Sequence, residues 1–233
     1  MKMKTLGIII ARGGSKELPK KNILKLGNKT LIEHAIKSAL NSKKLNKVIL
    51  STDDDEIINI AKKTKVGIPF KRPKKLARDD SSVYDVLKHA VNWLNKNQNY
   101  NPDIVVLLQC SVPFRTSLLI DKVIDKIIKT KAEAVLTITK PDYPPYWMLN
   151  INSYSNVSKL IKGKNYLRRQ QVPQSYQPSG SVYAFKSKFL MNIKGMLPQG
   201  KTKAIIISRE ESINIDTPLQ YELAKLLYKN KNK

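Results

Sequence analysis

The chain has 233 residues, with 43 Lys and Arg against 18 Asp and Glu, two His and one Cys, and a formal net charge of +25. With Cys110 as its one cysteine, the chain has no intrachain disulfide framework, and one Cys with two His is too few ligands for a closed structural zinc site. No run approaches the roughly 20 apolar residues of a membrane span, and the N-terminal apolar stretch is too short for a secretory signal. We therefore expect a cytoplasmic protein that folds as one domain over residues 1–233 and binds no membrane.

Short apolar runs alternate with helical patterns through the first part of the chain. The runs that we interpret as strands are residues 6–11, 47–52, 66–70, 104–109 and 134–139. Residues that begin helices stand between them, at Thr30, Asp53–Asp55, Ser82 and Thr116. This order predicts a three-layer α/β fold around a mostly parallel sheet, with ligands bound beyond the carboxyl ends of the strands.

The alternation breaks after residue 140. Residues 141–178 hold five prolines and several aromatic residues, so we expect this segment to leave the sheet as a small β-rich arm. Residues 182–185 and 204–208 return as strands. Pro218, just after Asp216 and Thr217, then starts a final helix, because a missing N–H costs nothing at that position.

A segment rich in glycine and lysine follows the first strand. It reads Arg12-Gly13-Gly14-Ser15-Lys16 and continues to Lys21-Asn22. Glycines let backbone N–H groups approach a phosphate, and the cations offset the charge of a triphosphate. The segment matches neither of the two common phosphate motifs, and a basic surface loop is the alternative interpretation. Its place directly after a buried strand favours phosphate binding.

Polar residues also end two later strands. Ser51-Thr52-Asp53 closes one of them, although a helix cap explains these residues equally well. Gln109 closes another, and its side-chain amide both donates and accepts hydrogen bonds, which suits a nucleobase edge or a sugar. We interpret Cys110 as a partly buried small side chain rather than a nucleophile, because no His lies in a recognisable partner motif.

Two motifs in the second half of the chain carry chemistry. Arg168 and Arg169, followed by two glutamines, suit a carboxylate, with a solvated face as the alternative. Asn214 and Asp216 would point to one side of a strand over residues 212–217. Their oxygens suit Mg²⁺, and the alternative for Asp216 is a helix cap.

Together these segments resemble one family, the acylneuraminate cytidylyltransferases (CMP-sialic acid synthetases). The resemblance covers about residues 5–228 and is most specific in ARGGSKxLPxKN, with STD, LLQ and SI.IDT in the same order. It implies a nucleotide-diphosphosugar-transferase-like fold, Mg²⁺ as cofactor, and a homodimer in which the arm at 141–178 helps to form the partner's sugar site. It further implies transfer of CMP from CTP to the anomeric hydroxyl of a nonulosonic (sialic-type) acid, with release of pyrophosphate.

The same resemblance implies roles for individual residues. Arg12, Lys21 and Asp216 would be catalytic, and Asp216 with Asn214 would hold Mg²⁺. The residues that it places around the nucleotide and the acidic sugar are Gly13, Gly14, Ser15, Lys16, Asn22, Arg72, Ser82, Gln109, Arg169, Gln170 and Tyr183.

Three departures from the family pattern bear on the substrate. Asn214 stands where a second Asp is common, so weaker metal binding is expected, or even a nucleotide-binding protein with impaired catalysis. Ser179 stands where sialic-acid enzymes often have Asn. The stretch 145–148, PYWM, stands where some of them place a Lys, which suggests a more apolar sugar of the legionaminic or pseudaminic type.

Two alternatives remain open. Within the same chemistry, the sugar would be the eight-carbon 3-deoxy-octulosonic acid. In a different class, the net charge of +25 would mark a basic nucleic-acid-binding protein. The lysines are spread along the whole chain and no zinc-finger, RNP-type or basic zipper pattern is visible, so we expect no specific nucleic-acid partner.

Overall fold

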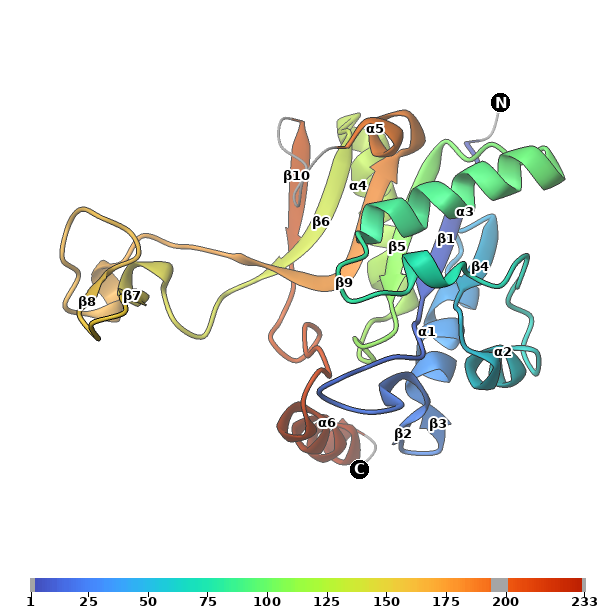
Figure 1. Ribbon diagram of the computed structural model, residues 1–233. Helices are drawn as coiled ribbons and strands as arrows, with labels where there is room; N and C mark the ends of the chain where they lie inside the picture. The colour runs from blue at the N-terminus through green and yellow to red at the C-terminus, as the bar shows by residue number, and fades with distance from the viewer. Residues whose placement is uncertain (1–2, 194–200, 232–233) are drawn as a thin grey trace.

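The computed structural model describes residues 3–193 and 201–231, and its body is built on a six-stranded sheet (Figure 1). The strand order is β10-β6-β9-β5-β1-β4. These strands are β1 (Thr5–Ile10), β4 (Lys47–Ser51), β5 (Ile104–Gln109), β6 (Ala134–Thr139), β9 (Gln177–Lys186) and β10 (Thr202–Ile206). β9 runs antiparallel to β5 and β6, and all other neighbours in this sheet are parallel. The predicted α/β class with a mostly parallel sheet is confirmed, with one antiparallel strand near its centre.

The strand predicted over residues 66–70 is wrong. Gly67 forms a single parallel bridge with Ile49, and its N–H donates to the Val48 carbonyl at 3.0 Å. Pro69 has no N–H with which to extend a ladder further. The segment therefore lies beside β4 as an extended loop.

Helices cover both faces of the sheet (Figure 1). They are α1 (Leu31–Leu40), α2 (Asp55–Ala61), α3 (Val83–Gln98), α4 (Ser117–Thr130), α5 (Ser187–Asn192) and α6 (Pro218–Lys231). The apolar side chains of α1, α2 and α4 are buried with one face of the sheet, and those of α3 and α5 with the other. In the part of the chain that the structure describes, no helix is both long and apolar enough to cross a bilayer.

The predicted helix starts are confirmed by their caps. Thr30 forms a capping box with Glu33, whose carboxylate accepts from the Thr30 N–H at 2.7 Å. Asp54, Ser82 and Thr116 each accept a backbone N–H in the first turn of the helix that follows. These caps fix where each helix begins relative to the strand before it, and so fix the loops at the edge of the sheet.

The segment between β6 and β9, residues 140–176, projects from the body (Figure 1). Gln177 and Pro178, the last two residues of the predicted arm, instead pair with β6 as the start of β9. This arm carries a hairpin of β7 (Leu149–Ile151) and β8 (Val157–Lys159). The residues Leu149, Ile151 and Val157 are 60%, 70% and 65% exposed. A two-stranded hairpin buries little apolar surface by itself, so the arm leaves hydrophobic side chains in contact with solvent.

Candidate active site

A cavity of about 260 Å³ opens where β1 and β5 end. Ile10 and Gln109 are the last residues of these parallel strands, lie opposite each other in the register, and both line the cavity. Open α/β sheets bind ligands at this edge. The predicted site residues that line the cavity are Arg12, Ser15, Lys21, Asn22, Arg72, Gln109 and Asp216.

The glycine-rich loop after β1 is held by side chains. Asn22 Nδ2 donates to the Arg12 carbonyl at 2.9 Å, which joins the two ends of the loop. The Gly13 N–H donates to Asp53 Oδ1 at 3.2 Å, and a Cβ at Gly13 would lie 2.4 Å from Asp54 Oδ2. The close approach requires glycine at this position. The loop is therefore fixed to the end of β4, and the Gly13 N–H is already occupied by a carboxylate.

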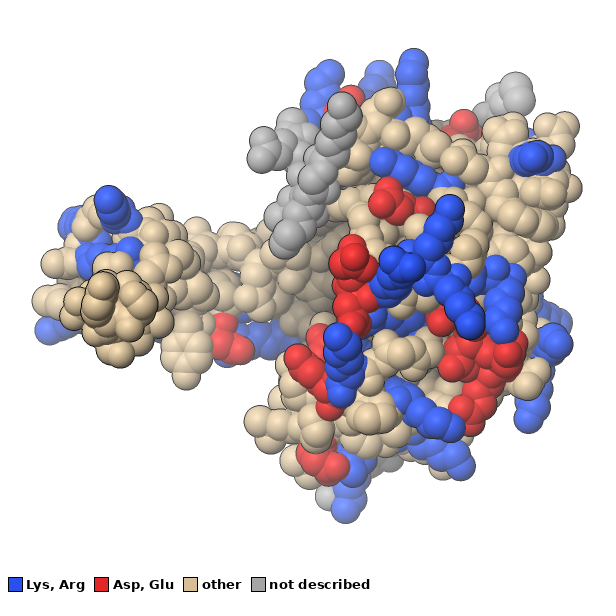
Figure 2. Space-filling model, viewed as in Figure 1, with Lys and Arg blue, Asp and Glu red and all other residues tan. Residues whose placement is uncertain are grey.

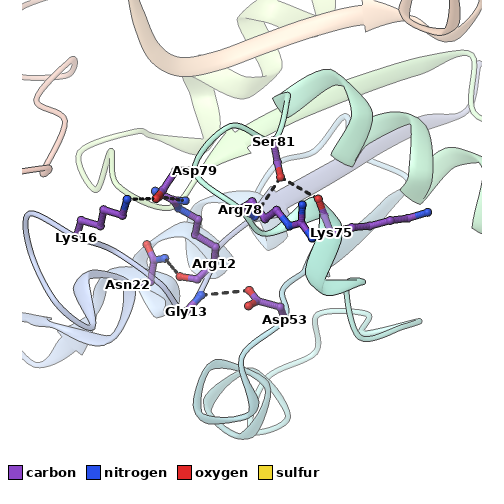
Figure 3. A network of polar contacts seen from close by, with 9 residues as sticks. All are labelled: Arg12, Gly13, Lys16, Asn22, Asp53, Lys75, Arg78, Asp79 and Ser81. Carbon is purple, nitrogen blue, oxygen red and sulfur yellow. Dashed lines mark hydrogen bonds and ion pairs between the residues drawn. The ribbon is translucent and has the colours of Figure 1, made fainter.

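An acidic residue that the sequence analysis did not select lies among the cations of this loop (Figure 3). Asp79 Oδ1 accepts from Arg12 at 2.6 Å, and Asp79 Oδ2 lies 2.6 Å from Lys16 Nζ. Hydrogen bonds from Lys16 and Arg12 lower the pKa of this carboxyl below its ordinary value. Basic and acidic side chains are interleaved in the same way over the face of the body seen in Figure 2. The cations of the loop thus have a carboxylate partner within the protein.

Lys21 reaches the other wall of the cavity. Its Nζ lies 2.6 Å from Asp216 Oδ1, and the Lys21 side chain is only 16% exposed. Asn214 Nδ2 donates to the second oxygen of Asp216. The strand predicted over residues 212–217 is wrong, because one backbone bond from the Ile215 N–H to the Ser111 carbonyl replaces a ladder. Asn214 and Asp216 are nevertheless in contact.

Asn214 and Asp216 have donor atoms that suit magnesium. Asn214 Oδ1 is buried without a hydrogen-bond partner among the described residues, and the Asp216 side chain is 43% exposed. No group of three or more His, Cys, Asp or Glu in the described ranges could hold a metal ion. Magnesium is commonly held by one or two carboxylates together with substrate phosphates. The residues present therefore fit an ion that is shared with a phosphate ligand.

Arg72 is a buried cation in the cavity wall. Its Nε donates to Ser51 Oγ at 3.0 Å, and its terminal nitrogen donates to the Ser51 carbonyl. Burial lowers the pKa of Arg72 to about 10. The guanidinium stays protonated at neutral pH and is fixed in place at the end of β4.

Cys110 is a buried residue of the cavity wall. Burial raises the pKa of its thiol to about 12, which disfavours the thiolate that a nucleophile needs. Arg115 is also buried, and its guanidinium donates to the carbonyls of Gln109 (2.9 Å) and Ser181 (3.0 Å). These bonds tie the end of β5 to β9, which supports the position of Gln109.

Several predicted site residues do not line the cavity. Ser82 caps α3, and the Tyr183 hydroxyl accepts from the Gly180 N–H at 2.9 Å. Arg169 and Gln170 lie in the arm, where the Arg169 guanidinium donates to the Asp142 carbonyl at 2.7 Å. Gly13, Gly14 and Lys16 belong to the loop but do not form the wall.

The sequence analysis missed part of the cavity wall. Leu76, Arg78, Asp79 and Ser81 line it, from the segment between β4 and α3. The signal for this segment was weak: Asp79 is half of an acidic doublet that follows a basic run. Nothing in the sequence pattern tells which of these residues meets the glycine-rich loop.

Comparison with known proteins covers almost the whole chain. A family model described as cytidylyltransferase matches residues 6–232. The chain is 32% identical to pseudaminic acid cytidylyltransferase from Campylobacter jejuni subsp. jejuni, over 97% of each chain. It is 31% identical to CMP-N,N'-diacetyllegionaminic acid synthase from Legionella pneumophila, over 97% of this chain and 96% of the relative.

A solved structure shares the fold. It is that of a CMP:2-keto-3-deoxy-manno-octonic acid synthetase complexed with CTP, with a TM-score of 0.72. The similarity covers 98% of this chain and 99% of the other, at 19% sequence identity. At this identity the comparison supports the fold and says nothing about the sugar.

Proposed function

The chain belongs to the cytidylyltransferase family, and from that premise we propose that it transfers CMP from CTP to the anomeric hydroxyl of a nonulosonic acid. The observation that carries the proposal is one cavity at the carboxyl ends of β1 and β5 that gathers Arg12, Lys21 and Asp216. Both substrates are anions, and a cavity lined by fixed cations attracts them.

The proposed reaction is a nucleophilic substitution at the α-phosphorus of CTP. The anomeric oxygen attacks the α-phosphorus, the bond from that phosphorus to the bridging oxygen breaks, and pyrophosphate leaves with the electron pair. The hydroxyl proton is released to solvent. Negative charge grows on the leaving group, and preorganised cations stabilise such charge. Arg12 and Lys21 take that role in the proposal, and the 2.6 Å ion pair with Asp216 holds Lys21 in the cavity wall.

We infer that Asp216, with the amide oxygen of Asn214, would hold Mg²⁺ together with the substrate phosphates. Bound there, the ion supplies positive charge beside those phosphates. The supporting observation is the buried, unpartnered Asn214 Oδ1 next to a half-exposed carboxylate. The Asn214 amide, whose Nδ2 bonds Asp216 in the structure, would turn its oxygen toward the ion, and Lys21 would share Asp216 with it.

The sugar site is proposed to be completed across a homodimer. Arg169 and Gln170 suit an acidic sugar by charge and hydrogen bonding, and both lie on the arm rather than in the cavity wall. A second copy that inserts its arm would bring them to the cavity. The exposed apolar side chains of the hairpin support this, because they would be covered in such a dimer.

For the sugar itself, we propose a nonulosonic acid that carries acetamido or deoxy groups and so presents more apolar surface, such as methyl groups, than a fully hydroxylated sugar. Tyr146 and Tyr166 meet edge to face in the arm at 5.2 Å between ring centroids, and Trp147 Nε1 donates to the Tyr166 carbonyl at 2.8 Å. This aromatic cluster offers apolar surface to a sugar substituent. Both similar relatives are named for sugars of that kind, pseudaminic acid and diacetyllegionaminic acid.

A pyrophosphate-release screen tests the proposal. The purified protein is offered each of the four nucleoside triphosphates with Mg²⁺ and pseudaminic, legionaminic, sialic or 3-deoxy-octulosonic acid. We expect turnover with CTP and with at least one nine-carbon acid. Turnover with the eight-carbon acid alone would make that acid the substrate instead of a nine-carbon one. If CTP binds but no acid gives turnover, the proposal is overturned.

A further inference from the structure

We propose that Asp79 is an internal anion that occupies the triphosphate position of the cavity and sets its affinity for phosphate ligands. The inference rests on the proposed function, because it assumes that Arg12 and Lys16 receive a triphosphate. It adds a residue with a role opposite to theirs: one that competes with the ligand.

The geometry of Asp79 is that of a bound oxyanion (Figure 3). Each carboxylate oxygen faces a different cation, with Oδ1 2.6 Å from the Arg12 guanidinium and Oδ2 2.6 Å from Lys16 Nζ. Two oxygens that each accept a charge-assisted hydrogen bond are what a phosphate would present to the same pair. Asp79 also lines the cavity with Arg12, so it borders the proposed binding volume.

The backbone that carries Asp79 is held, while its side chain is accessible. Ser81 Oγ accepts from the Arg78 N–H at 3.0 Å and donates to the Lys75 carbonyl at 3.1 Å, which closes a turn around Asp79. The Asp79 side chain is 47% exposed, and the Lys16 side chain 82%. Rotation of exposed side chains is therefore enough to break both ion pairs without unfolding the turn.

Ion pairs of this exposure are weak, so a ligand can exchange with them. Each contributes little free energy in water, because solvent and salt screen it. A triphosphate carries several negative charges against the single charge of Asp79 and displaces it at Arg12 and Lys16. Because the ligand must break the ion pairs of Asp79 in order to bind, the net affinity is lower than it would be without Asp79. This holds for pyrophosphate as well as for CTP.

The consequence is faster release of the product. Pyrophosphate that has left the α-phosphorus remains among the same cations, and the returning Asp79 carboxylate competes for them. A loop that carries cations alone would hold pyrophosphate longer. Asp79 thus weakens the binding of substrate and product and, by speeding product release, raises turnover. Tighter binding of both substrate and product would not raise turnover.

Binding of inorganic pyrophosphate and of tripolyphosphate, measured by calorimetry on the intact protein without sugar, tests the proposal. The variant is Asp79→Asn, which keeps the shape and removes the charge. The matched control is Asp80→Asn, because Asp80 is the adjacent exposed acid and forms no ion pair within the described residues. Thermal unfolding of both variants checks that they are folded.

We expect Asp79→Asn to bind both ligands about threefold to tenfold more tightly, which lies within what two exposed ion pairs supply, and Asp80→Asn to bind them as the unmodified protein does. If both variants bind the ligands more tightly by the same factor, the effect comes from the net charge alone. If Asp79→Asn binds them more weakly, Asp79 helps to bind the ligand. Either result overturns the proposal. Turnover is assayed separately, so an affinity difference that persists without turnover on any sugar would count against the proposed reaction alone.

Discussion

Lys21 and Asp216 lie 195 residues apart in the chain and form an ion pair of 2.6 Å across the cavity. Each is anchored by its own segment: Lys21 belongs to the loop that Asn22 closes onto the Arg12 carbonyl. On the other side, the Asp216 N–H donates to Gln220 Oε1 at 2.8 Å, at the start of α6. The pair therefore joins the first loop of the fold to the segment that leads into its last helix.

Replacing Lys21 tests its assignment to the leaving group. Lys21→Ala should lower kcat by roughly 10²–10³-fold, the usual effect of removing one donor that stabilises developing charge, while CTP binding changes far less. Lys25→Ala is the control, since Lys25 is an exposed lysine that does not line the cavity. Steady-state kinetics and calorimetric CTP binding separate the two effects, and an equal loss in both would contradict the assignment.

The strands that could be predicted from the sequence are the continuous apolar runs, because a strand buried on both faces is apolar at nearly every position. The insertion of β9 between β5 and β6 was not predictable in this way, since strand order depends on long-range pairing such as Leu107 with Tyr183. The segment 66–70 has a strand-like composition, yet Pro69 and a lone bridge at Gly67 leave it outside the sheet. The local sequence pattern thus predicts which segments form strands, whereas long-range contacts decide which strands pair with one another.

Restoring a carboxylate at position 214 tests the magnesium proposal. Asn214→Asp replaces the amide that donates to Asp216 and brings two carboxylates together. Without metal they repel each other, so the unfolding midpoint should fall, and Mg²⁺ should restore it. A Mg²⁺ titration followed by thermal unfolding should show about tenfold tighter binding than in the unmodified protein. Identical titrations for both proteins would remove Asn214 from the metal site.

The two glycines of the first loop should differ in their tolerance of a side chain. Gly13→Ala puts a methyl group 2.4 Å from Asp54 Oδ2, at the residue that caps α2. It should lower the free energy of unfolding by about 1–3 kcal/mol and weaken CTP binding, because the loop must move from Asp53. Apart from Gly14 itself and its two chain neighbours, no atom of the described structure lies within 4 Å of the corresponding position at Gly14, so Gly14→Ala is the control. Urea unfolding compares them, and equal effects would contradict this account.

Acid should destabilise the fold through its two histidines. Burial is the largest cause that lowers the pKa of His34 and of His89 below 6.5, so the folded chain holds them neutral. As the pH falls from about 6.5 through the lower folded values, the unfolded chain binds more protons and stability decreases. Urea midpoints between about pH 7.5 and 5.5 measure the slope. His89→Gln should flatten it, and an unchanged slope would exclude a contribution from His89.

Part of the cavity wall could be predicted from the sequence, and part could not. Gln109 ends β5 and Arg12 closely follows β1, so the edge of a parallel sheet predicts that they meet. Lys21 lies farther along the same loop as Arg12. Asp79 follows no strand, and the turn that Ser81 closes decides where it lies. That turn depends on side-chain bonds to backbone groups, which no hydrophobic periodicity encodes.

Mixing two inactive variants tests whether the arm serves the partner copy. Lys21→Ala damages the cavity and keeps the arm, whereas Arg169→Ala keeps the cavity and damages the arm. If the arm of one copy completes the site of the other, half of the randomly mixed dimers contain one site built from an intact cavity and an intact arm. Co-refolding equal amounts should therefore recover about a quarter of the unmodified activity.

The same mixture distinguishes the other arrangement of the arm. If each arm served its own chain, every site in a mixed dimer would contain one damaged part, and activity would stay at the sum of the two variants. Arg168→Ala in place of Arg169→Ala is the control, since the Arg169 side chain rather than that of Arg168 bonds the Pro141 and Asp142 carbonyls at the base of the arm. A monomer in sedimentation at assay concentration, active without any partner, would contradict the swapped arm directly.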